Sequence, residues 1–260
     1  MGAAFLDDVG LLNGSARILD VGAGTATLLY WLAARAAKVV AVDLYGQGPF
    51  RHGEADEGML ASAAAFAPGP YPEDRLEVRW MDARALDFED GHFDAVVSFS
   101  SIEHFGHRGD VRAAAREIGR VLRPGGWAFL VTEGFVKMGL SARAPVQFLA
   151  RVATAGRRCR TATPRSRASE VLTRREASVD IISASGLELV QPFDERISPA
   201  MLANPHLLTP AGTFEPVDGT SFPHLVLGFH GSRFTSMALP LRKAGGSSAT
   251  TTGSTGRPSP

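Results

Sequence analysis

The chain has 260 residues, and its 27 basic and 27 acidic side chains balance, so net charge does not indicate a polyanionic partner. A hydrophobic share of 45% is enough to cover both faces of a buried sheet, but no stretch approaches the ~18 consecutive apolar residues of a membrane span. The single cysteine, Cys159, excludes an intrachain disulfide and the N-terminus lacks the pattern of a secretory signal, so we expect a soluble cytoplasmic protein.

Strand-like and helix-like segments alternate through the first half of the chain. Short apolar runs predict strands at residues 17–21, 39–42, 76–81, 93–99 and 127–131. Segments without helix breakers predict helices at residues 26–36, 59–67 and 112–122, and a loop is expected at Tyr45–Gly53. This alternation indicates βαβ units and a parallel sheet.

The second half is less regular. We expect helices at 145–155 and 170–184, a strand at 187–190, a proline-rich loop at 199–223, and an antiparallel edge hairpin from 224–229 and 234–241. Residues 244–260 are Gly, Ser, Thr and Pro-rich, a composition that cannot bury enough apolar surface to fold. The expected organisation is one domain over residues 1–243 and a disordered tail over 244–260.

The most informative segment is Asp20-Val21-Gly22-Ala23-Gly24-Thr25-Ala26, between the first strand and the first helix. Its glycines permit a tight turn and a close ligand approach. The helix N-terminus behind them is expected to offer free N–H groups to an anionic group. Dinucleotide-binding domains also use such a turn, but the third glycine of their fingerprint would fall at Thr27, which opposes a nicotinamide-dependent oxidoreductase.

This turn resembles motif I of the class I methyltransferases that use S-adenosylmethionine (SAM), in which an acid stands two places before the first glycine. Four further segments resemble the later motifs of that family in the same order: residues 39–43, 81–83, 93–98 and 122–126. The resemblance covers Ile18–Val131. It implies a doubly wound α/β fold with a mostly parallel, seven-stranded, Rossmann-like sheet and SAM as the cofactor.

The resemblance also assigns parts of the cofactor to residues of this sequence. The methionine part would lie against the glycine turn with Asp20 near its ammonium group, the ribose would bond Asp43, and the adenine amino group would bond Asp82. The expected cofactor-binding residues are Asp20, Gly22, Ala23, Gly24, Thr25, Asp43, Leu44, Asp82, Ala83 and Ser98. No metal ligands are predicted.

Methyl transfer requires an acceptor atom held in line with the methyl group and, for a hydroxyl, removal of a proton. The segment Ser100–Phe105 follows the fourth strand, where this family faces its substrate. His104 is the candidate base, with a substrate contact or an ordinary loop histidine as alternatives. Glu103 either orients His104 or hydrogen-bonds elsewhere.

The substrate is the least defined part of the prediction. The Glu-His-Phe-Gly string and the late Phe234-Thr235-Ser236 segment resemble methyltransferases found with bacterial glycan assembly enzymes, which implies a small-molecule or sugar acceptor methylated at oxygen. A non-catalytic SAM-binding or partner-binding module is the alternative.

Two further features leave alternatives open. Residues Arg143–Arg175 hold nine arginines against one acid, Glu170, which suits a phosphate-bearing ligand or a solvated helix face. Phe148 is the only aromatic residue among these arginines, so the segment lacks a base-stacking surface and a nucleic-acid partner is not favoured.

Few residues precede the first strand, so either Phe5–Leu12 forms a minimal lid or a roof over the site comes from elsewhere.

Overall fold

The computed structural model describes residues 2–47, 54–137, 171–193, 197, 206–207, 226–229 and 232–245. The helix expected at 145–155, Cys159, most of the arginine run, most of the loop at 199–223 and the tail beyond residue 245 lie outside these ranges. No helix within them is long and apolar enough to cross a membrane.

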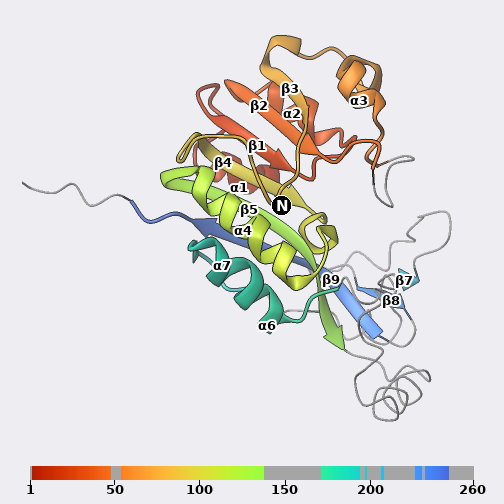
Figure 1. The fold of residues 1–260 in the computed structure, drawn as a ribbon, viewed down its shortest axis with the longest axis vertical. Coiled ribbons are helices and arrows are strands. Elements are labelled where there is room, and N and C mark those ends of the chain that lie inside the picture. Colours follow the sequence, from red (N-terminus) through yellow and green to blue (C-terminus); the bar gives the residue numbers. More distant parts are fainter. Residues whose placement is uncertain are drawn as a thin grey trace, which may run out of the picture.

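One sheet organises the described residues, in the order β3-β2-β1-β4-β5-β9-β8-β7, with β6 also paired to β9 (Figure 1). The strands are β1 (Arg17–Val21), β2 (Lys38–Asp43), β3 (Leu76–Trp80), β4 (Phe93–Phe99), β5 (Leu122–Lys137), β6 (Glu188–Leu189), β7 (His206–Leu207), β8 (Leu227–Phe229) and β9 (Ser232–Arg242). Neighbours from β3 to β5 are parallel, whereas β9 is antiparallel to β5, β6 and β8. The expected doubly wound, mostly parallel sheet with an antiparallel edge hairpin is confirmed, and the short strands β7 and β8 extend it.

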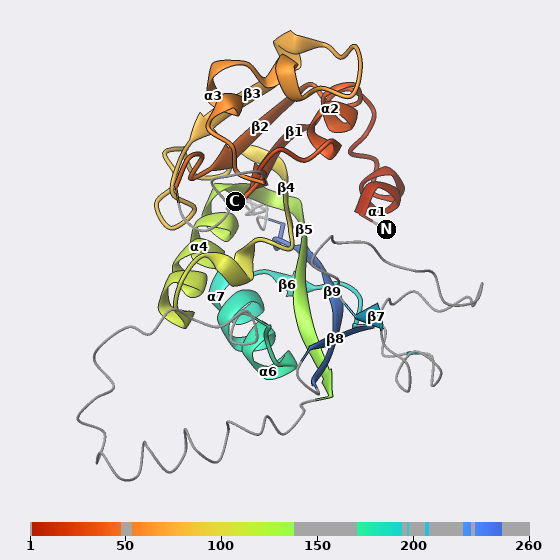
Figure 2. The same ribbon diagram turned by 90° about the vertical axis from the view of Figure 1, so that its right-hand side faces the viewer.

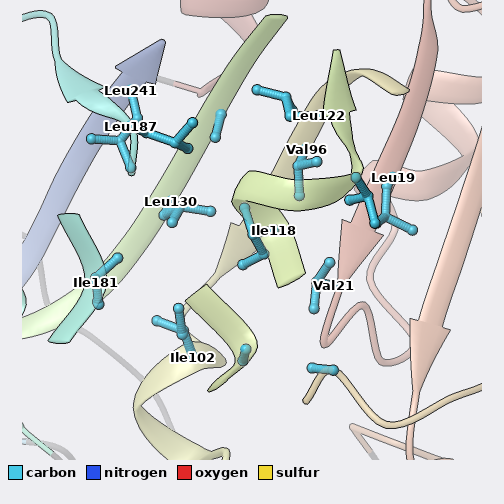
Figure 3. Close-up of a cluster of buried hydrophobic side chains, with 14 of the residues drawn as sticks. Leu19, Val21, Val96, Ile102, Ile118, Leu122, Leu130, Ile181, Leu187 and Leu241 are labelled. Atoms are coloured by element: carbon cyan, nitrogen blue, oxygen red, sulfur yellow. The ribbon is translucent and has the colours of Figure 1, made fainter. Parts of the chain in front are cut away.

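Helices cover both faces of the sheet, which explains why its central strands are continuous apolar runs. Figure 2 shows α1 (Gly2–Asp8) and α2 (Leu28–Ala33) on one side, and α4 (Arg108–Val121), α6 (Arg174–Glu176) and α7 (Ser183–Ser185) on the other. Ile118 and Ile181 meet Leu130 of β5 in the buried cluster between α4 and the sheet (Figure 3). Burial of such side chains stabilises the fold by about 1.5–3 kcal/mol each.

Several boundaries differ from those expected. Helix α4 begins four residues earlier, at Arg108, because the Asp110 carboxylate accepts the backbone N–H of His107 (2.7 Å) in a capping box. Strand β5 runs past its predicted C-terminal end because β9 pairs with it as far as Lys137. It also begins earlier, because Leu122 pairs with Phe93 of β4 and the predicted turn at 122–126 becomes a register shift between the two strands. The helix expected at 59–67 divides into α3 (Gly58–Ala61) and a 3₁₀ turn (Ala63–Phe66).

The late helical segment starts at Arg174 rather than residue 170, because Thr173 caps it by accepting the Glu176 N–H (3.2 Å). Its middle, η5 (Ala177–Ile182), is a π-helix that joins α6 to α7. Asp180 in this segment is buried and accepts hydrogen bonds from Arg108 (2.5 Å) and Arg112 (2.6 Å) of α4. These ion pairs fasten the segment to α4.

The N-terminal helix α1 packs onto a face of the sheet. The ring of Phe5 lies 5.6 Å from that of Trp127 and 4.9 Å from that of Phe129, and Leu6 is buried in the same cluster. None of the residues 5–12 lines the cavity described below, so the proposal that Phe5–Leu12 forms a minimal lid is wrong.

Candidate functional site

A cavity of about 560 Å³ lies at the carboxyl ends of the parallel strands, where open α/β sheets bind ligands. The turns after β1, β2 and β3 and the segment after β4 all contribute to its wall. The lining residues are Gly22, Ala23, Gly24, Thr25, Ala26, Val42, Asp43, Leu44, Gln47, Glu54, Ala55, Met81, Asp82, Ala83, Arg84, Phe99, Ser100, Ser101, His104, Phe105 and Gly106.

The two glycines of the first turn are required by its geometry. Gly22 (φ +72°) and Gly24 (φ +53°) adopt left-handed conformations that disfavour side chains. A Cβ atom on Gly22 would stand 2.5 Å from Cβ of Ser101, and one on Gly24 would stand 2.2 Å from the carbonyl oxygen of Glu54. The Ser101 hydroxyl also donates to the Gly22 carbonyl (2.7 Å), so the segment after β4 is fastened to this turn.

The backbone N–H groups of the turn already have acceptors within the protein. The pairs are Gly22 and Ala23 with the Val42 carbonyl (2.9 and 3.2 Å), Gly24 with the Asp43 carboxylate (2.9 Å), and Thr25 with the Glu54 carbonyl (2.7 Å). These four N–H groups are therefore satisfied within the protein, whereas the free N–H groups expected at the N-terminus of the following helix stay a prediction. The turn shapes the cavity wall through its missing Cβ atoms.

Two carboxylates stand at the ends of adjacent strands. Asp43 ends β2 and lines the cavity beside Leu44, whose N–H it binds at 2.6 Å. Burial raises the pKa of Asp43, and the N–H groups of Gly24 and Leu44 oppose that rise. Asp20 on β1 is only 2% exposed and does not line the cavity; burial and the neighbouring Asp43 raise its pKa to about 7.

The turn after β3 brings a basic side chain into the cavity. Asp82 and Ala83 line the wall together with Arg84, which sequence reasoning missed. The Arg84 guanidinium donates to the Asp82 carboxylate (2.6 Å from Nη2) and lies 3.2 Å from Asp110. Hydrogen bonds from Arg84 lower the pKa of Asp82.

The segment after β4 has a strained start. Ser100 has φ +48°, the one positive φ at a non-glycine residue in the described ranges, and it lines the cavity. Such strain is often found at functional sites. The 3₁₀ turn Ile102–His104 follows and brings His104 to the cavity wall, whereas Ser98 is fully buried within β4 and does not line it.

Glu103 turns away from the cavity, and its carboxylate accepts the backbone N–H of Glu133 on β5 (3.2 Å). It is 1% exposed, and burial raises its pKa to about 7. Of the two arrangements expected for Glu103, the structure thus shows a hydrogen bond elsewhere in the fold.

Gln47, Glu54, Ala55 and Phe99 also line the cavity, although no sequence pattern singled them out. Glu54 lies almost thirty residues along the chain from Thr25, to which its carbonyl bonds, so only the folded chain reveals this contact. Within the described ranges, no three His, Cys, Asp or Glu side chains are grouped as metal ligands.

Residues 19–130 match the protein family described as "Methyltransferase domain". The match spans the strands and turns that build the cavity. This match agrees with the class I SAM-dependent methyltransferases that the sequence motifs resemble. SAM is the cofactor that this match supports.

Several curated relatives of the matched region are methyltransferases by name. A demethylmenaquinone methyltransferase of Clavibacter sepedonicus is 40% identical over 112 residues, 42% of this chain and 38% of the relative. A ubiquinone biosynthesis O-methyltransferase of Leptothrix cholodnii is 31% identical over 126 residues, 48% of this chain and 46% of the relative. The chain thus spans less than half the length of these relatives.

Solved structures share the fold of the methyltransferase domain at low sequence identity. A putative methyltransferase from Bacillus halodurans is 20% identical, with a TM-score of 0.53 over 93% of this chain and 98% of the other. The [4+2]-cyclase SpnF is 16% identical, with a TM-score of 0.57 over 94% of this chain and 80% of the other. Since one neighbour is named a cyclase, the fold alone does not decide the reaction.

Proposed function

We propose that this chain is an active SAM-dependent methyltransferase that methylates a small-molecule or sugar acceptor at oxygen, within one domain over residues 1–243. The observation that carries the proposal is the single cavity shared by the turns after β1, β2 and β3 and by the segment after β4. A cofactor in contact with the turns after β1, β2 and β3 would hold its methyl group toward the segment after β4.

The cofactor half of the cavity suits SAM, which supplies an activated methyl group when bound. Gly22, Ala23, Gly24 and Thr25 line the part of the cavity that we assign to the methionine part. The missing Cβ atoms of the two glycines let Ser101 and Glu54 pack against this turn and close the wall behind it. Each carboxylate oxygen of Asp43 holds one N–H and keeps a lone pair for a ribose hydroxyl.

The adenine would lie between Leu44 and the Asp82-Ala83 turn, where the Asp82 carboxylate is held in place by Arg84. We assign Asp20 and Ser98 a supporting role, since both are buried behind the cavity wall.

In the acceptor half, His104 is the proposed base. It lines the cavity beside Ser101 and Phe105, so an acceptor hydroxyl bound there would have a proton acceptor within reach. Relatives named for demethylmenaquinone and for ubiquinone biosynthesis support a small-molecule acceptor, and one of them is an O-methyltransferase by name.

The test combines calorimetry with SAM and transfer of a labelled methyl group from SAM to a small-molecule cell extract. We expect saturable binding and one labelled acceptor, and we expect His104→Ala to lower turnover while SAM affinity is retained. Binding without labelling would favour a non-catalytic module. Absence of SAM binding would refute the proposal, and full activity of His104→Ala would remove its role as base.

A further inference from the structure

The carboxylates that line the cavity differ in how many hydrogen bonds and ion pairs they form within the protein. Asp43 holds two backbone N–H groups, and Asp82 is paired with Arg84. Glu54 also lines the cavity and is exposed, but no group among the described residues binds its carboxylate. Glu54 is therefore the carboxylate most available to a cationic ligand.

The backbone of Glu54 is fixed directly over the glycine turn. Its carbonyl accepts the Thr25 N–H at 2.7 Å and fills the space that a Cβ on Gly24 would need. The next residue, Ala55, is buried, and its carbonyl accepts the Gly46 N–H at 2.9 Å. The Glu54 side chain thus starts from a defined point beside the part of the cavity assigned to methionine.

Asp20 is less suited to neutralise a cation in the cavity. It lies behind the wall, and at neutral pH it is only partly ionised because burial and Asp43 raise its pKa to about 7. A buried carboxyl without a cation beside it favours its neutral form. An accessible carboxylate on the cavity wall stays solvated and does not pay this desolvation penalty for being ionised.

We propose that Glu54, on the loop between β2 and α3, contacts the cofactor and pairs its carboxylate with the ammonium group of the methionine part. This inference rests on the proposed function, since it requires SAM in the cavity. If Glu54 were only a solvated surface residue, its substitution would leave SAM affinity unchanged.

The experiment measures the affinity of Glu54→Gln for three ligands by calorimetry: SAM, S-adenosylhomocysteine and 5′-methylthioadenosine. The first two carry the ammonium group and the third lacks it. We expect roughly three- to tenfold weaker binding of the first two, the scale of a partly exposed ion pair, and unchanged binding of the third. The loss should shrink as salt concentration rises.

Glu57→Gln is the matched control, because Glu57 belongs to the same segment and is exposed but does not line the cavity. Unchanged SAM affinity of Glu54→Gln would overturn the inference while the proposed function stands. The inference would also be overturned if Glu54→Gln weakened the binding of all three ligands equally, or if Glu57→Gln weakened SAM binding as much as Glu54→Gln does. A loss in Asp20→Asn alone would assign the counter-charge to Asp20. If the unaltered protein does not bind SAM, both proposals are refuted.

Discussion

Replacing Asp20 by Asn should change how the stability of the protein depends on pH. Burial and Asp43 raise the pKa of Asp20 from 3.8 to about 7 in the folded protein. The folded state therefore binds the Asp20 proton more tightly than the unfolded state. The resulting stabilisation is complete below about pH 3.8 and is lost as pH rises toward 7.

One pKa unit corresponds to about 1.4 kcal/mol, so Asp20 should lower the free energy of unfolding by roughly 2–3 kcal/mol between about pH 5 and about pH 8.5. Urea unfolding followed by circular dichroism at both pH values would measure this loss. In Asp20→Asn the Asp20 contribution should disappear, because an amide does not titrate in this range.

Glu103→Gln provides a parallel measurement, because burial also raises the pKa of Glu103 to about 7 and its contribution has the same sign. Each variant should remove part of the pH dependence, and the double variant should remove both parts. If Asp20→Asn and the unaltered protein lost the same stability between the two pH values, Asp20 would be ionised in the folded state and the reasoning would be wrong.

Three further predictions concern single side chains. Gly24→Ala should destabilise the protein by about 2 kcal/mol and weaken SAM binding, because its Cβ would displace the Glu54 carbonyl; an unchanged melting temperature would contradict this. Asp43→Ala should weaken SAM binding by ~1–3 kcal/mol in calorimetry, and unchanged affinity would remove Asp43 from the site. Asp180→Ala should lower the free energy of unfolding by about 2 kcal/mol without affecting SAM affinity, because it leaves Arg108 and Arg112 without their shared acceptor; urea unfolding checks this.

Local patterns were enough to predict the parallel sheet and the turns that follow its strands. A short apolar run that ends in an acid or a glycine can be recognised from a few neighbouring residues. The turns at Asp43 and Asp82 could therefore be located without the structure. The same reasoning placed His104 in the segment after β4, and it lies on the cavity wall.

Features set by distant partners could not be predicted. Strand β5 is long because β9, about one hundred residues later, pairs along it. The N–H groups of the glycine turn donate hydrogen bonds to the carbonyls of Val42 and Glu54. No sequence pattern around residue 22 identifies these acceptors. Burial of Asp20 depends on strands that flank β1 on both sides.

The closed hydrogen bonding of the glycine turn has a consequence for ligand affinity. Because neighbouring segments already hold the turn in shape, a ligand that enters does not have to order this stretch of backbone. The conformational entropy lost on binding then comes mainly from the ligand and from exposed side chains such as Glu54, so less of the favourable contact energy is offset.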